Sequence, residues 1–153
     1  MKVTFRYERD IVHDQKREYV ITRLCQYMAY LIDLPHSVEI EFCKLGKSAY
    51  GETVLNPHCK NMIRLNCELL LREILIPLVH ELIHLEQIHT GKLSVSRTGQ
   101  ITWEGQMHRA KDLTRMSHRD YTHQPWEQDV AKKQRLLLEK VLDHALEANP
   151  KTT

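Results

Sequence analysis

The stretch Ile74-Leu-Ile-Pro-Leu-Val-His-Glu-Leu-Ile-His-Leu85 is apolar enough to form a mostly buried helix. The apolar pattern extends over residues 67–90. We expect an interruption or kink near Pro77, because proline lacks the backbone N–H that a helix interior uses. Gly91 is expected to end the helix. Leu75, Val79 and Leu82 form one stripe of this helix, and two histidines lie roughly opposite to it.

Strands and helices are predicted on both sides of this segment. Alternating polar and apolar residues predict two strands, Lys2–Tyr7 and Ser37–Leu45, and two further short strands are predicted at Tyr50–Leu55 and Asn61–Leu65. Helical spacing predicts a helix from Asp14, its capping residue, to about Asp33, and a last helix over Trp126–Leu146. Lys92–Ser96 and Gln100–Trp103 flank Arg97-Thr-Gly99 and predict a hairpin, whereas Gly105–Gln124 is weakly patterned. This order predicts an α+β fold, in which a small, mostly antiparallel sheet packs on the central helix beside the N-terminal and C-terminal helices.

Length and composition limit the class of protein. The 153 residues suffice for one domain, which we assign to residues 1–149, with a disordered tail over 150–153. Hydrophobic residues make up 42% of the chain and charged residues 27%, which excludes wholesale disorder. The net charge of +2 is too balanced for a protein that wraps nucleic acid.

The compartment is predicted from the N-terminus and the cysteines. No apolar run approaches the roughly 18 residues that a membrane span needs, and the charged first ten residues predict no signal peptide. The four cysteines form no CxxC pair, so we expect free thiols in a reducing cytoplasm.

The chemistry is concentrated in His80-Glu81-Leu82-Ile83-His84, an HExxH motif. Histidines four residues apart on a helix lie on one face, so both imidazoles can reach one zinc ion. Glu81 lies beside them as a candidate general base. The competing interpretation is a hydrogen-bonded histidine pair in the core, but burying two histidines and a glutamate is costly unless something satisfies them. We therefore expect a zinc site.

An HExxH helix that follows a small sheet resembles the zincin superfamily of metallopeptidases. The metzincin extension of this motif is absent, because Gln87 and Thr90 stand where it needs glycine and histidine. In gluzincins a glutamate from a following helix completes the site. The segment Tyr121-Thr-His-Gln-Pro-Trp-Glu127 resembles one found in small zincin-like proteins, often from phages and mobile elements. In those proteins HExxHxxQ precedes a W-x-G stretch, which Gln87, Trp103 and Gly105 match.

The third zinc ligand has three candidates. Pro125 fits the first turn of a helix and would fix Glu127 on a rigid element, which favours Glu127. Glu104 has the spacing of the thermolysin-like branch but lies at a hairpin end. His108 would be the ligand in a SprT-like protease, although those proteins carry glycine and an aromatic residue after that histidine, and this chain has Arg109-Ala110.

The predicted function is that of a zinc-dependent metallopeptidase acting on a protein or peptide. Glu81 would assist the attack of a zinc-bound water, and Tyr121 and His123 are candidates to stabilise the oxyanion. A peptide substrate would pair with an exposed edge strand, which we assign to Asn61–Leu65. The resemblance implies the host cytoplasm if the chain is phage-encoded.

Two alternatives stay open. One is a SprT-like, nucleic-acid-associated protease whose basic run includes His108, Arg109, Lys111, Arg115 and Arg119, although a solvated surface is the simpler interpretation of such a run. The other is a catalytically inactive, zinc-stabilised interaction or inhibitor protein of the phage type.

Overall fold

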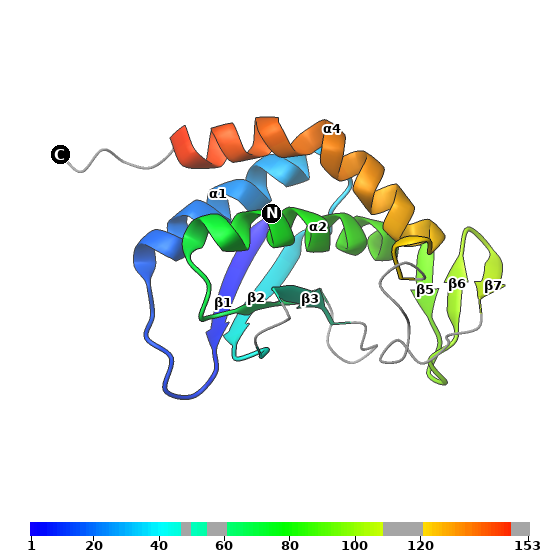
Figure 1. Ribbon diagram of the computed structural model, residues 1–153, viewed down its shortest axis with the longest axis horizontal. Coiled ribbons are helices and arrows are strands. Elements are labelled where there is room, and N and C mark those ends of the chain that lie inside the picture. The colour runs from blue at the N-terminus through cyan, green and yellow to red at the C-terminus, as the bar shows by residue number, and fades with distance from the viewer. Residues whose placement is uncertain (47–49, 55–60, 109–120, 148–153) are drawn as a thin grey trace.

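The computed structural model describes residues 1–46, 50–54, 61–108 and 121–147, which form helices and two sheets (Figure 1). The helices are α1 (Gln15–Leu31), α2 (Leu71–His89) and α4 (Pro125–Glu147). The larger sheet has the order β1-β2-β4-β3 and consists of β1 (Lys2–Tyr7), β2 (Ser37–Cys43), β3 (Gly51–Thr53) and β4 (Met62–Asn66). The smaller sheet has the order β5-β6-β7 and consists of β5 (Leu93–Val95), β6 (Ile101–Trp103) and β7 (Gln106–His108). The predicted α+β class is confirmed.

The strand directions in the larger sheet differ from the mostly antiparallel arrangement that we expected. β1 pairs with β2 in parallel and β2 pairs with β4 in parallel, while only β3 runs antiparallel to its neighbour β4. The physical reason lies in the connection between β1 and β2. α1 carries the chain back to the end of the sheet at which β1 begins, so β2 runs in the same direction as β1. Alternating polarity shows which face of a strand is buried but not which way it runs.

The described helices cover one face of the larger sheet. Val38, Ile40 and Phe42 of β2 are buried toward the helices, while Glu39 and Glu41 between them are only half-buried. The opposite face carries charges, and Arg64 of β4 forms ion pairs with Glu41 at 3.7 Å and with Glu52 at 3.4 Å. The apolar side therefore fixes the register of the strands.

The helices form two further layers. α2 packs against β3 and β4, and α4 packs against both α1 and α2, on the side of these helices away from the larger sheet (Figure 1). α2 continues through Pro77, so the predicted interruption is wrong, and the alternative of a kink there stays a prediction. A proline inside a helix costs about 3 kcal/mol, but Ile74, Leu75 and Leu78 beside it are fully buried and offset that cost.

The local predictions for helix ends and turns are mostly confirmed. Asp14 caps α1, since its Oδ1 accepts a hydrogen bond from the backbone N–H of Arg17 at 3.2 Å. Gly91 follows the end of α2 with a φ of +79°, a conformation that glycine adopts without strain. The predicted hairpin is β5–β6. β7 was not predicted, because three residues are too few to show alternation.

Two predictions concern residues outside the described ranges. These are the tail over residues 150–153 and most of the basic run, residues 109–119. Among the residues that the structure describes, no helix combines the length and the apolar character needed to cross a membrane.

The two faces of β4 give a test of this arrangement. Ile63 is fully buried, so we expect Ile63→Ala to lower the free energy of unfolding by about 2–5 kcal/mol. Arg64 next to it faces the charged side, so we expect Arg64→Ala to cost less than about 1 kcal/mol. Urea denaturation of both variants measures the difference, and equal losses would contradict the orientation of β4.

Candidate metal centre

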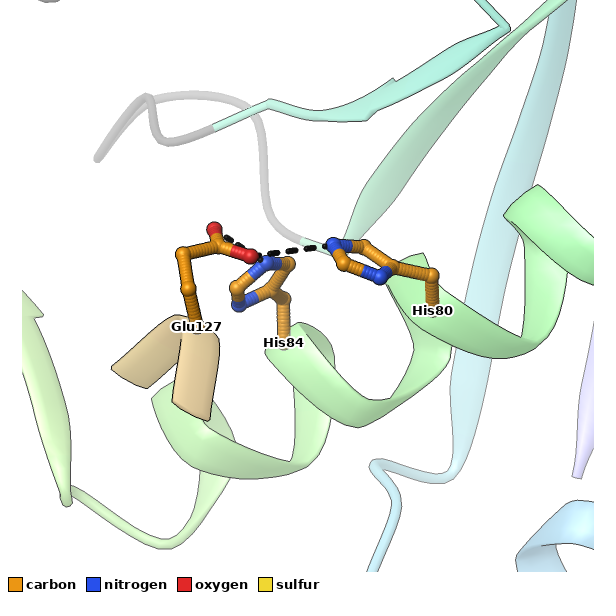
Figure 2. A group of neighbouring side chains, drawn as sticks. All are labelled: His80, His84 and Glu127. Atoms are coloured by element: carbon orange, nitrogen blue, oxygen red, sulfur yellow. Dashed lines mark ion pairs between the residues drawn. The ribbon is translucent and has the colours of Figure 1, made fainter. Parts of the chain in front are cut away.

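Three side chains from two helices meet at one point (Figure 2). His80 and His84 lie one turn apart on α2, and Glu127 lies in the first turn of α4. The Nε2 atom of His80 is 3.2 Å from Oε2 of Glu127, and the Nε2 atom of His84 is 2.9 Å from Oε1. One candidate ligand atom from each of the three residues lies within 4.8 Å of the others, which is close enough for a shared metal ion.

The site is largely withdrawn from solvent. His84 is 8% exposed, Glu127 is 6% exposed, and the His80 side chain is 27% exposed. Burial of a carboxylate costs several kcal/mol unless a positive charge compensates it. The two imidazoles are therefore part of what allows Glu127 to be buried.

The other nitrogen of each imidazole is held by a glutamine. Nδ1 of His84 is 2.9 Å from Oε1 of Gln87, and Nδ1 of His80 is 3.2 Å from Oε1 of Gln134. Where a glutamine presents its amide oxygen, which only accepts hydrogen bonds, the Nδ1 that faces it carries the proton. In a neutral imidazole this leaves Nε2 with a free lone pair directed at Glu127.

The orientation of the Gln87 amide is fixed independently. Its Nε2 donates to the backbone oxygen of Trp126 at 2.9 Å and to Oδ2 of Asp129 at 2.8 Å. Exchanging the amide oxygen and nitrogen would break both bonds, so the oxygen must face His84. Gln87 thus selects the His84 tautomer whose Nε2 is free to bind a metal.

These contacts test whether the residues fit a cation. Two Nε2 lone pairs that face a carboxylate repel it, unless each ring gains a proton or a metal ion lies between them. The donor set of two imidazoles and one carboxylate is that of catalytic zinc sites, which leave a fourth position open. The arrangement fits a zinc ion held by His80, His84 and Glu127.

The electrostatics of the three side chains agree with a site for positive charge. Burial lowers the pKa of both His80 and His84, but the contact with Glu127 outweighs it, so both pKa values are raised. Burial raises the pKa of Glu127, but the hydrogen bonds from the two imidazoles bring it down to about 2. The carboxylate is therefore ionised at any physiological pH.

Glu81, the predicted general base, lies beside this group on α2 and is 9% exposed. The hydroxyl of Thr53 hydrogen-bonds to its carboxylate, and Thr53 Oγ1 is also 3.2 Å from the Glu81 carbonyl oxygen. Thr53 belongs to β3, one of the two edge strands of the larger sheet. β3 therefore orients the carboxylate that the HExxH motif supplies.

A cavity of about 260 Å³ opens at the site. Glu81, His84 and Glu127 line it together with Tyr121, one of the two predicted oxyanion donors. Burial raises the pKa of the Tyr121 phenol, and the charge of Glu127 and a hydrogen bond to it raise that pKa further. The other predicted donor, His123, is exposed and is not among the residues that line the cavity.

Neither of the two alternative third ligands belongs to this group. Glu104 is exposed on the turn between β6 and β7, with a φ of 47°. The ring of His108 meets Trp126 edge-on, with 5.4 Å between ring centroids. Among the described residues, the group that could hold a metal consists of His80, His84 and Glu127, the set that the sequence predicts.

Three residues that hold the side chains of the site in place were not predicted from the sequence. Gln87 was noted only as part of a resemblance, and neither Gln134 nor Thr53 was singled out. Gln134 had a detectable signal, because it follows Glu127 by seven residues and so lies on the same face of α4. Thr53 had none, since its role depends on how β3 lies against α2.

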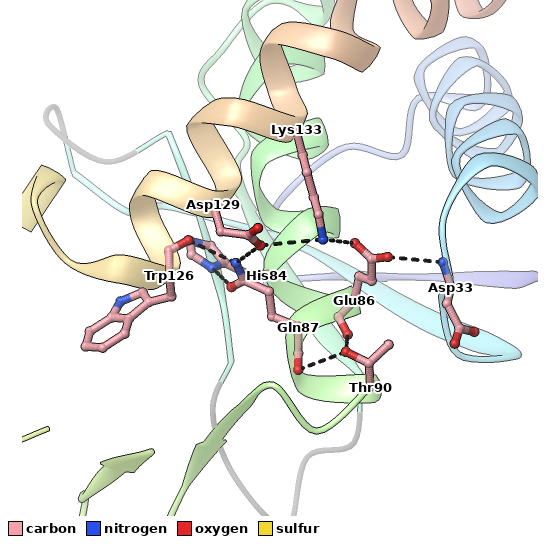
Figure 3. Close-up of polar contacts among 8 residues, drawn as sticks. All are labelled: Asp33, His84, Glu86, Gln87, Thr90, Trp126, Asp129 and Lys133. Atoms are coloured by element: carbon pink, nitrogen blue, oxygen red, sulfur yellow. Dashed lines mark hydrogen bonds and ion pairs between the residues drawn. The ribbon is translucent and has the colours of Figure 1, made fainter. Parts of the chain in front are cut away.

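A network of polar and charged side chains extends from Gln87 across the interface of α2 and α4 (Figure 3). Lys133 Nζ lies 3.5 Å from the Asp129 carboxylate that binds Gln87 and 3.0 Å from Oε2 of Glu86. Burial lowers the pKa of Lys133, but Glu86 and Asp129 more than offset this, so the pKa is raised and the amine stays charged. This network ties the helix that carries the histidines to the helix that carries Glu127.

Comparisons with known proteins identified no relative. No protein-family model matches the chain, and neither the curated proteins nor the solved structures contain a match to it.

Replacing Glu127 tests its role as a ligand. We expect Glu127→Gln to weaken zinc binding by more than the roughly 10–100-fold that losing a hydrogen-bond partner of a ligand causes. Glu104→Gln is the matched control and should bind zinc like the wild type. Zinc content after dialysis and competition titration measure both. Wild-type affinity in Glu127→Gln would contradict the assignment.

Replacing Gln87 tests whether it holds His84 in place. We expect Gln87→Leu to weaken zinc binding about 10–100-fold, because the imidazole loses the partner that fixes its tautomer. Gln128→Leu, the same change at an exposed position of α4, should have no effect. Calorimetric titration with zinc compares the two, and an unchanged affinity in Gln87→Leu would show that the contact is dispensable.

Proposed function

We propose that this chain is a zinc-dependent peptidase of the zincin type. The observation that carries the proposal is the pair of imidazole Nε2 atoms on α2 that face one buried carboxylate on α4, with Glu81 lining the adjoining cavity. His80, His84 and Glu127 would hold the zinc ion, and the fourth position would be open.

Glu81 is the group placed to move the proton. Bound zinc supplies a water of lowered pKa and polarises a substrate carbonyl. The Glu81 carboxylate accepts the proton from the attacking water and passes it to the departing amine. The hydrogen bond from Thr53 occupies one carboxylate oxygen and leaves the other for this transfer.

Tyr121 is suited to stabilise the negative charge that develops on the carbonyl oxygen. Its raised pKa keeps the phenol protonated at neutral pH, so it is a hydrogen-bond donor. A donor fixed in a partly buried site stabilises an oxyanion more than water does. Since His123 does not line the cavity, Tyr121 is the better supported of the two predicted donors.

The strand that a peptide would pair with differs from our expectation. The predicted strand, Asn61–Leu65, corresponds to β4, which lies between β2 and β3 and has no free edge. β3 is an edge strand, and its residues Gly51, Glu52 and Thr53 line the cavity. A peptide that adds to β3 would therefore pass the metal centre.

The two alternatives have less support. The hypothesis of a SprT-like protease needs His108 as a zinc ligand, and the His108 ring packs on Trp126 instead. A zinc-stabilised binding protein without turnover differs from a peptidase in not needing Glu81, which makes Glu81 the residue to test.

The decisive variant is Glu81→Gln, which keeps the size of the side chain and removes its basicity. We expect zinc-loaded wild type to cleave members of a complex peptide mixture, detected by mass spectrometry. Glu81→Gln should bind zinc equally well and lose about 10²–10⁴-fold in rate. Glu104→Gln is the control. If zinc-loaded wild type cleaved nothing, or if Glu81→Gln cleaved as fast as the wild type, the result would favour a zinc-stabilised binding protein without turnover.

A further inference from the structure

Part of the lining of the cavity at the metal centre is apolar. Three apolar side chains, which we call the apolar wall, line it together with Glu81, His84 and Glu127; they are Leu93 of β5, Ile101 of β6 and Trp126 of α4. We propose that the apolar wall binds an apolar side chain of the substrate, so that the protein cleaves polypeptides beside a leucine-like or phenylalanine-like residue. This inference rests on the proposed peptidase function and names its substrate class.

The apolar wall is a built surface. Leu93 pairs with Trp103, and Val95 pairs with Ile101, so these four side chains share one face of the smaller sheet. They pack with Trp126 in a cluster separate from the main core. Leu93, Ile101 and Trp126 are 3%, 5% and 7% exposed, so their positions are fixed by packing rather than free to adapt.

The apolar wall and the reacting groups belong to the same cavity. Trp126 lines it together with His84, Glu127 and Glu81. A side chain that contacts the Trp126 ring inside this cavity is thus close to the metal centre. An apolar subsite here would select the residue that adjoins the cleaved bond.

Charge and size favour one apolar side chain over other occupants. The cavity contains the carboxylates of Glu52, Glu81 and Glu127, which repel an acidic side chain. These carboxylates also attract a basic side chain, but each already has a partner. Glu127 faces two imidazoles, and Glu81 accepts a hydrogen bond from Thr53. Glu52 is half-exposed and paired with Arg64, so it attracts a cation weakly. The volume of about 260 Å³ lies below the roughly 300–1,000 Å³ of small-molecule sites.

The test uses peptide hydroxamates, which bind an open zinc position and need no turnover. The series carries a leucyl, phenylalanyl, aspartyl or lysyl side chain next to the hydroxamate, and affinity for zinc-loaded protein is measured by calorimetry. We expect the leucyl and phenylalanyl compounds to bind at least about tenfold more tightly than the aspartyl and lysyl compounds.

A pair of variants locates the effect. Ile101→Thr makes the wall polar, and we expect it to reduce the preference for leucyl over aspartyl compounds by about fivefold or more. Val95→Thr, the same kind of change at the cross-strand partner that does not line the cavity, should leave the preference unchanged. Circular dichroism and zinc content establish that both variants are folded and loaded.

The outcomes separate this inference from the proposed function. Equal affinity for all four hydroxamates, or tighter binding of the lysyl or aspartyl compound by wild type, would overturn the apolar subsite and leave the peptidase proposal standing. No binding of any hydroxamate to zinc-loaded wild type would mean that the metal has no open position, and both proposals would fail. The wild-type series decides even if Ile101→Thr does not fold.

Discussion

The contact between the Glu127 carboxylate and the imidazoles of His80 and His84 is the constraint around which the two helices are arranged. A nearly buried carboxylate needs hydrogen bonds or positive charge to compensate for its lost hydration, and for Glu127 these come from imidazoles on another helix. α2 and α4 therefore have to meet at one angle and one depth. The Gln87 amide and the Lys133 ammonium hold that meeting point from the side, through Asp129 and Glu86.

The fold could be predicted where the signal is local. β1, α1 and α4 lie within one or two residues of their predicted bounds, because alternation and helical spacing reflect burial along a single segment. The parallel pairing of β1, β2 and β4 could not be predicted in this way, since direction depends on where the connecting chain returns. The continuous helix through Pro77 also depends on tertiary packing, which offsets the missing hydrogen bond.

In the candidate site, too, the residues with a local signal could be predicted, and the contacts between elements could not. His80, Glu81 and His84 follow from spacing on one helix, and Glu127 follows from a helix start at Pro125. Their partners were harder to find. Gln134 and Thr53 act across element boundaries, from α4 to α2 and from β3 to α2. A single sequence does not state which strand edge faces which helix, so such partners appear only once the layers are assembled.

The separation of the site between α2 and α4 has a consequence for biosynthesis. The ribosome delivers the histidines on α2 well before it delivers Glu127, and domains fold in the order in which the chain emerges. A nascent chain that displays the complete HExxH segment still lacks its acidic partner and the helix that orients it. The assembly of α4 is thus the step that completes the candidate metal centre, and the full set of three side chains exists only after residues of both helices have been synthesised.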